Sequence, residues 1–288
     1  MIKYTLPDFT HGLGLNLFFI NLLKKQPEWF FENLRIDSVY GCFPSCIMNG
    51  GRSFINKRYS AQQIEQTFAL LQEHGVTARL TFTNMLAEKK YLQDEYVALI
   101  LSIAQSYPVE IIVYSDEIFE ELKRDYGFAC VLSTTRGISD ISEFNAATKK
   151  YDYVVLDYNM NKNLDFIKGI ENPDKVELMV NEYCRPHCPY RKQHYLQNSA
   201  DQLEGVAHYF SCSHQDGGEF FKHKEGHPIY LTNNEVLRMN DEFGFSYFKI
   251  VGRGIAFETV LESYVYYLVK PAYREQVKRM VRNSANKQ

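Results

Sequence analysis

The sequence has 288 residues, of which 45% are hydrophobic and 23% are charged, and its formal net charge is −3. This composition is typical of a globular protein with one large core, and the near-neutral charge argues against a general attraction to nucleic acid. No run of about 18 apolar residues occurs, and the first residues lack the features of a signal peptide, so we expect a cytoplasmic protein without a membrane span. In that reducing compartment, the six cysteines are expected to be thiols or metal ligands rather than disulfides.

Hydrophobic periodicity predicts an N-terminal helix over residues 9–31, where apolar residues recur at helical spacing: Phe9, Leu13, Leu17, Ile20 and Leu23. Short apolar runs bounded by turn formers predict eight strands, at 36–42, 77–83, 109–114, 129–133, 153–157, 176–180, 228–231 and 247–251. Helices are predicted at about 60–74, 93–106, 116–125, 140–149, 162–170 and 233–242, followed by two C-terminal helices at about 256–269 and 271–284. Ser60, and either Thr232 or Asn233, are typical helix N-caps.

Strict alternation of strands and helices predicts a parallel sheet, and eight units predict closure into a (β/α)8 TIM-like barrel. We expect one domain over residues 1–288, with a Cys/His-rich insertion at about 184–227 after the sixth strand. An open doubly wound sheet is the other arrangement, but no GxGxxG or P-loop motif opens any helix. In a barrel, the loops after the strands converge on one rim, where they would bring together Arg52, Asn84, Asn181, Glu182 and Arg253.

The insertion holds six of the eight histidines and three of the six cysteines. Cys184 and Cys188 form a CxxxC pair and Cys212 follows, while a second CxxxC pair, Cys42 and Cys46, lies on another rim loop. Thiolates suit iron–sulfur clusters and zinc, and a [4Fe–4S] cluster usually takes four cysteines. We therefore expect a [4Fe–4S] cluster on Cys184, Cys188, Cys212 and either Cys42 or Cys46.

Zinc is the alternative metal, because His194 and His214 add nitrogen ligands to the same segment. Ordinary loop thiols without a metal are the third interpretation. Cys130 lies inside a predicted strand and is expected to be a small core residue.

Three segments, VNEYCRPHCPYR, FKIVGRG and LTFTN, resemble the collagenase-like peptidase family of unassigned catalytic type. The resemblance implies an α/β barrel, and several family members look like iron–sulfur proteins of oxygen-independent hydroxylation that act on ubiquinone precursors or RNA bases. Carried over to this chain, Cys184, Cys188 and Cys212 match the cysteine-bearing region and Arg253 matches the arginine of the family's GR motif. The cysteine spacing departs from the family pattern, and Val251 stands where the family has an acidic residue, so the substrate does not transfer.

Other polar residues are candidates for the chemistry. Glu182 could act as a general acid or base beside Asn181, or it could be a carboxylate paired with Arg191 or Arg253. Arg52, in the flexible sequence NGGR, could hold a carboxylate or phosphate in a bidentate manner. Lys249 alternates with apolar residues and is expected to point into the barrel, where it either meets a carboxylate or serves the site.

These patterns lead to three functional hypotheses. The first is an iron–sulfur enzyme of redox or oxygen-insertion type, acting on a small molecule or nucleobase and supplied by an electron donor or partner protein. Its catalytic residues would be Glu182, Asn181 and Arg253, and its substrate-binding residues would be Arg52, Asn84, Arg191 and Lys249. The second is a zinc-dependent hydrolase with Glu182 as base, and the third is a non-enzymatic iron–sulfur partner protein.

Overall fold

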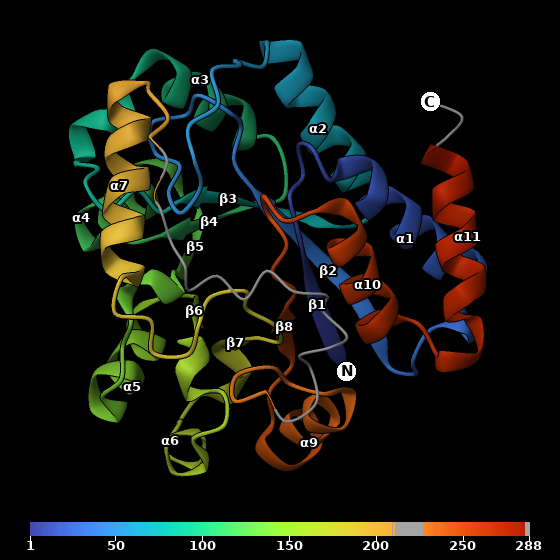
Figure 1. The fold of residues 1–288 in the computed structure, drawn as a ribbon. Coiled ribbons are helices and arrows are strands. Elements are labelled where there is room, and N and C mark those ends of the chain that lie inside the picture. The colour runs from blue at the N-terminus through green and yellow to red at the C-terminus, as the bar shows by residue number, and fades with distance from the viewer. Residues whose placement is uncertain (209, 211–226, 286–288) are drawn as a thin grey trace.

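The computed structural model describes residues 1–208, 210 and 227–285. Eight parallel strands form a closed barrel in which each strand pairs with the next and β8 returns to β1 (Figure 1). The strands are β1 (Ile2–Pro7), β2 (Leu34–Gly41), β3 (Thr77–Phe82), β4 (Val109–Val113), β5 (Ala129–Leu132), β6 (Tyr153–Val155), β7 (Val176–Met179) and β8 (Tyr247–Lys249). The TIM-like barrel fold expected from the sequence is therefore confirmed.

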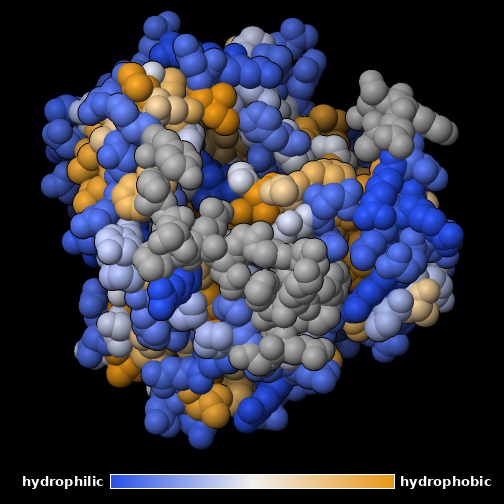
Figure 2. Space-filling model, viewed as in Figure 1, coloured by the Kyte–Doolittle hydropathy of each residue, from blue (hydrophilic) through white to orange (hydrophobic). Residues whose placement is uncertain are grey.

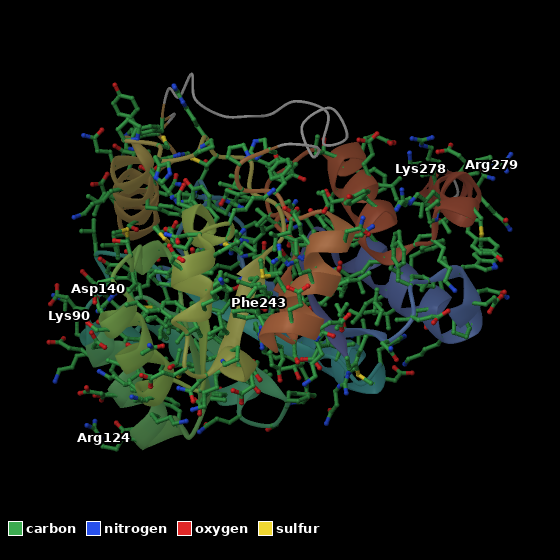
Figure 3. The ribbon with its side chains drawn as sticks, turned by 90° about the horizontal axis from the view of Figure 1, so that it is seen from below. Lys90, Arg124, Asp140, Phe243, Lys278 and Arg279 are labelled. Carbon is green, nitrogen blue, oxygen red and sulfur yellow. The ribbon has the colours of Figure 1, made fainter. Side chains whose placement is uncertain are left out.

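Helices surround the barrel, as in other α/β barrels (Figure 1). They are α1 (Leu13–Lys25), α2 (Ala61–Glu73), α3 (Glu95–Ala104), α4 (Asp116–Glu121), α5 (Ile141–Lys150), α6 (Leu164–Lys168), α7 (Arg191–Glu204), α9 (Asn233–Phe243), α10 (Phe257–Leu268) and α11 (Arg274–Ala285). The predicted N-caps are confirmed, because Ser60 and Thr232 each form a capping box at the start of α2 and α9. At the periphery lie charged side chains, with Lys90, Arg124 and Asp140 along one edge and Arg279 at the opposite edge (Figure 3).

The N-terminal helix predicted over residues 9–31 is wrong in its extent. The chain begins instead with β1, which lies between β2 and β8, and α1 starts only at Leu13. Phe9 belongs to the β1–α1 loop and packs on Phe43, with ring centroids 5.3 Å apart. Phe9 is therefore a core residue of this loop, and its helical spacing from Leu13 and Leu17 does not place it in the helix.

The strand predicted at 228–231 is also wrong, although its apolar residues are buried as expected. Other groups satisfy its backbone: Leu231 N donates to Val180 O at 2.9 Å, Asn161 Nδ2 donates to Ile229 O at 3.0 Å, and Tyr267 Oη donates to Leu231 O at 2.9 Å. The barrel still has the expected eight strands, because it contains β1, which was not predicted, and lacks the strand that was predicted at 228–231. The Cys/His-rich insertion therefore follows the seventh strand rather than the sixth.

Within the part of the chain that the structure describes, no helix is long and apolar enough to cross a bilayer.

Candidate functional site

A network of charged side chains fills the barrel interior below the rim. Glu177 on β7 is fully buried, and its Oε1 accepts hydrogen bonds from Thr5 and from Arg79 Nη1, the latter at 2.6 Å. Arg79 also donates from Nε to Glu110 at 2.7 Å. Burial alone would raise the pKa of Glu177, but the charges of Arg79 and Lys249 outweigh it and hold this pKa below its usual value. The network is thus an ionised cluster in the middle of the core.

Lys249, the last residue of β8, points into this interior as expected from the sequence. Its Nζ lies 3.6 Å from Glu177 Oε2 and 4.0 Å from the centroid of the Tyr40 ring. Burial lowers the pKa of Lys249 to about 8; Glu177 opposes this shift, whereas Arg79 and Arg253 add to it. Lys249 and Arg79 therefore both pair with the carboxylate of Glu177.

A depressed lysine pKa has a defined effect on stability. Below about pH 8 both the folded and unfolded chains carry the Lys249 proton, so the full cost of burying its charge is present. As pH rises from about 8 towards the ordinary value of 10.5, the folded state releases this proton while the unfolded state keeps it, so this group makes the free energy of unfolding rise.

We expect Lys249→Met to remove this contribution. Urea denaturation at several pH values between about 7.5 and 9.5 should show a less positive slope of unfolding free energy against pH in Lys249→Met than in the wild type. Equal slopes in the two proteins would show that Lys249 titrates normally in the fold.

Above Lys249, the loop after β8 carries Arg253, which is held by the loop after β2 and by the end of strand β3. Its guanidinium donates to Asn49 Oδ1 at 3.0 Å, to Thr81 Oγ1 at 2.6 Å and to Gly50 O at 2.9 Å. The loop can bring Gly50 O here because its backbone passes directly against Thr83, where an added Cβ would lie 2.2 Å from Thr83 O. Arg253 is therefore fixed in place by neutral acceptors.

Arg52 lies beside Arg253 and is held more loosely. Among the described residues, its guanidinium donates only to Gly51 O, at 2.6 Å from Nη1. The Nε atoms of Arg52 and Arg253 are both buried without a hydrogen-bond partner in the described part of the chain. Burial and the charge of Arg52 lower the pKa of Arg253, so the two cations are close enough to repel.

Neither of these arginines has a carboxylate within ion-pair distance among the residues described here. In contrast, two other arginines near the barrel axis and mouth are neutralised: the buried Arg79 pairs with Glu110 and Glu177, and the half-buried Arg191 pairs with Glu182. Buried cations without a partner are costly. The rim therefore carries two positive charges, at Arg52 and Arg253, that no ion pair among the described residues neutralises, and the carboxylate of Asp8 offsets the charge of Arg253 only from a greater distance.

Both arginines line a cavity of about 790 Å³ on the side of the rim formed by β8, β1 and β2. This volume falls in the usual range of small-molecule sites. Figure 2 shows hydrophobic residues reaching the surface near the start of α10, among hydrophilic neighbours. We call this cavity the rim cavity.

The β1–α1 loop supplies cavity residues that the sequence analysis missed. Asp8 adopts φ 64°, an unusual value for a residue other than glycine, and its Oδ1 accepts from Thr10 N and from His11 N, each at 3.0 Å. His11 Nδ1 lies 4.0 Å from Asp8 Oδ2, and the His11 side chain is 54% exposed. The signal that could have located them is the sequence IKYTLPD, in which apolar residues alternate with polar ones as in a strand and turn formers follow.

Glu182 and Arg191 form an ion pair next to the barrel mouth, which is one of the two arrangements expected from the sequence. Arg191 Nη2 lies 3.0 Å from Glu182 Oε2, and Glu182 Oε1 accepts from the backbone of Tyr183 at 2.8 Å and of Cys184 at 3.2 Å. The Arg191 guanidinium also lies 4.3 Å from the ring centroid of Tyr158. Glu182 therefore has its charge compensated, and any role as acid or base stays a prediction.

Asn181 and Asn84 are fully buried and join segments of backbone. Asn181 exchanges two hydrogen bonds with Val251, at 2.7 and 3.0 Å, which ties the end of β7 to the end of β8. Asn84 Nδ2 donates to Ile47 O at 2.7 Å and to Ser199 O at 3.0 Å, which fixes α7 over the rim. The structure thus places both amides in contact with protein rather than with the rim cavity.

Four of the five described cysteines fall into two separate pairs, and the fifth, Cys130, is a buried core residue of β5 as expected. Cys42 and Cys46 are buried together, and burial and their mutual hydrogen bond raise the pKa of Cys46 well above its usual value. Cys184 and Cys188 are partly exposed, and burial raises the pKa of Cys184 although Arg191 opposes the shift. Cys212 and His214 lie outside the described residues. Within the described ranges, no three His, Cys, Asp or Glu side chains are grouped as metal ligands.

The fold and the geometry together define a (β/α)8 barrel protein with a cationic cavity at the rim where barrel enzymes have their active sites. No family model matches the sequence, and no curated protein matches it.

Solved structures do resemble the fold. The U32 peptidase Mk0906 is 13% identical, with a TM-score of 0.54 over 88% of this chain and 93% of that one. Weaker similarities are found with the chitinase ChiC from Aspergillus fumigatus (10% identity, TM-score 0.43, 87% and 91% of the chains) and with a sugar phosphate isomerase/epimerase from Parabacteroides distasonis (13%, 0.42, 92% and 94%). The U32 peptidase is of the collagenase-like family that the sequence motifs resemble, so the implied barrel architecture is confirmed, and the similarity extends to the fold alone.

Proposed function

We propose that this barrel is an enzyme whose small-molecule substrate carries a carboxylate or phosphate, held by Arg52 and Arg253 in the rim cavity. The observation that supports the proposal is the pair of adjacent guanidiniums in the cavity wall, for which the described residues offer no carboxylate at ion-pair distance. Arginine binds carboxylate and phosphate oxygens through two parallel hydrogen bonds. Such an anion would neutralise the positive charge of Arg52 and Arg253. His11, with Asp8 beside it, lines the same cavity and is the candidate group for proton transfer to the bound substrate.

Titration calorimetry with inorganic phosphate, sulfate and acetate tests this proposal. We expect saturable binding in which the anions compete for one site and the affinity falls as sodium chloride is added, because a charged contact is screened by salt. The absence of saturable binding for all three anions would contradict the proposal.

A second proposal concerns the Cys184–Cys188 pair. These two partly exposed thiols lie in one loop beside Arg191, as two ligands of a metal centre would. The described residues alone do not fit a [4Fe–4S] cluster, because they bring two thiols together where four are needed. A cluster would supply electron transfer to the redox chemistry expected from the sequence, and zinc would instead supply a Lewis acid. In the cytoplasm, where we propose that the protein works, these thiols stay reduced and available.

Analysis of iron, sulfide and zinc in protein purified without oxygen tests this second proposal. A cluster predicts about four iron and four sulfide per chain, with lower values in Cys184→Ser and Cys188→Ser and unchanged values in Cys130→Ala. One zinc without sulfide would select the hydrolase hypothesis. Protein with neither metal would contradict a metal centre at this pair.

A further inference from the structure

The rim cavity has two chemically different halves. Its charged lining residues and its histidine are confined to the rim loops: Asp8, His11, Arg52 and Arg253. Among the described residues, the helices contribute only uncharged side chains and one glycine: Gly14, Leu15, Leu17, Phe18 and Asn21 from α1, Gln202 from α7, Phe257, Val260 and Tyr264 from α10, and Val281 and Ser284 from α11. Polarity therefore changes along the cavity, from cationic at the rim to largely apolar between the helices.

The apolar half is long enough to hold the body of a ligand. Gly14 and Asn21 both line the cavity from α1, and seven residues of helix extend about 10 Å. Along this wall Leu17 and Phe18 are only half-buried, although they pack against the core on one side. A hydrocarbon chain or an aromatic ring lying there would cover surface that now faces water.

Two large apolar side chains stand at the same cavity in an exposed position. Ile55, on the loop after β2, is 47% exposed, and Phe257, at the start of α10, is 46% exposed. They come from opposite ends of the sequence and meet at one cavity. Such a pair beside a cationic site is the arrangement that recognises an apolar group attached to an anion.

We propose that the rim cavity binds an amphiphilic anion, with a carboxylate or phosphate head group at Arg52 and Arg253 and an apolar body along α1 between Ile55 and Phe257. This inference rests on the proposed function of the cavity and specifies the class of its substrate. The head group compensates the paired arginines, and the body removes the half-exposed apolar wall from water.

The test measures binding of two homologous series by calorimetry: straight-chain carboxylates from acetate upwards, and monoalkyl phosphates with inorganic phosphate as their first member. Affinity should rise about fourfold for each added methylene group until the apolar wall is covered, because each buried methylene contributes about 0.8 kcal/mol. The series with the higher affinity identifies the head group.

Variants at the apolar wall separate this inference from the proposed function. Ile55→Ser and Phe257→Ser should reduce the gain per methylene, expressed relative to the affinity of the same variant for acetate or inorganic phosphate. Leu237→Ser is the matched control, since Leu237 is 45% exposed on α9 and does not line the cavity, and it should leave the gain unchanged.

The outcomes distinguish the two proposals. If acetate or phosphate binds but added carbons do not raise the affinity, the inference is overturned and the proposed function stands. If chain length raises the affinity equally in Phe257→Ser, Ile55→Ser and the wild type, the body lies elsewhere and the inference is also overturned. If no member of either series binds, both proposals fail.

Discussion

Replacing Arg52 by methionine should weaken the binding of carboxylate or phosphate ligands by roughly 10- to 100-fold, because a hydrogen bond to a charged group contributes about 1.5–3 kcal/mol. Within the described residues Arg52 donates only to Gly51 O in its own loop, so its removal leaves the rest of the rim intact. Arg253→Met should have at least the same effect on binding. It should also lower the free energy of unfolding, because Asn49, Thr81 and Gly50 lose their donor.

The matched control is Arg238→Met. Arg238 is exposed on α9 and pairs with Glu242, so this variant makes the same change in net charge away from the cavity. Calorimetry should show wild-type affinity for this control and the loss only for the two rim variants. Equal affinities in Arg52→Met, Arg238→Met and the wild type would show that Arg52 does not contact the anion.

Arg79→Met should lower the free energy of unfolding by about 3–5 kcal/mol, the loss typical of a broken buried ion pair. The Arg79 side chain is 1% exposed, and it donates to Glu177, which is fully buried, as well as to Glu110. Without Arg79, Glu177 would keep, among the residues that the structure describes, only Thr5 and the more distant Lys249 as partners. The buried carboxylate would then be under-compensated.

Urea denaturation of the variant measures this loss, and Lys123→Met provides the comparison. Lys123 forms an exposed pair with Asp152, so its replacement should cost no more than about 1 kcal/mol. The double variant Arg79→Met, Glu177→Gln should recover part of the loss, because the unpaired charge is gone. An Arg79→Met variant as stable as Lys123→Met would contradict the role given to this network.

Most of the barrel could be predicted because its strands are buried on both faces. The runs at β3, β4, β5 and β7 are short, rich in buried apolar residues and bounded by turn formers, although β3, β4 and β7 also carry Arg79, Glu110 and Glu177, and the structure places them within a residue or two of the expected ranges. β1 escaped detection because Phe9, Leu13 and Leu17 continue in helical register just after it. The segment at 228–231 was wrongly predicted as a strand because it is apolar and buried. Its backbone carbonyls accept hydrogen bonds from side chains such as Asn161 and Tyr267 instead of from a neighbouring strand.

The site was predictable only in part, for a related reason. Barrel topology places residues that follow different strands on one rim, which is why Arg52 and Arg253 could be expected to meet although about 200 residues separate them. The sequence alone does not specify which polar groups are already occupied. Asn181 and Asn84 are engaged by Val251, Ile47 and Ser199, and these contacts depend on long-range packing. The Asp8–His11 loop could not be placed at the cavity while β1 was unrecognised.

A crystal structure of the protein grown with a short alkyl phosphate or carboxylate tests the central claim most directly. Our account predicts an anionic head group between Arg52 and Arg253, with its oxygens about 3 Å from guanidinium nitrogens of both residues and its carbon chain directed along α1. A rim cavity that contains only water at a saturating ligand concentration, or a ligand bound elsewhere on the barrel, would contradict it.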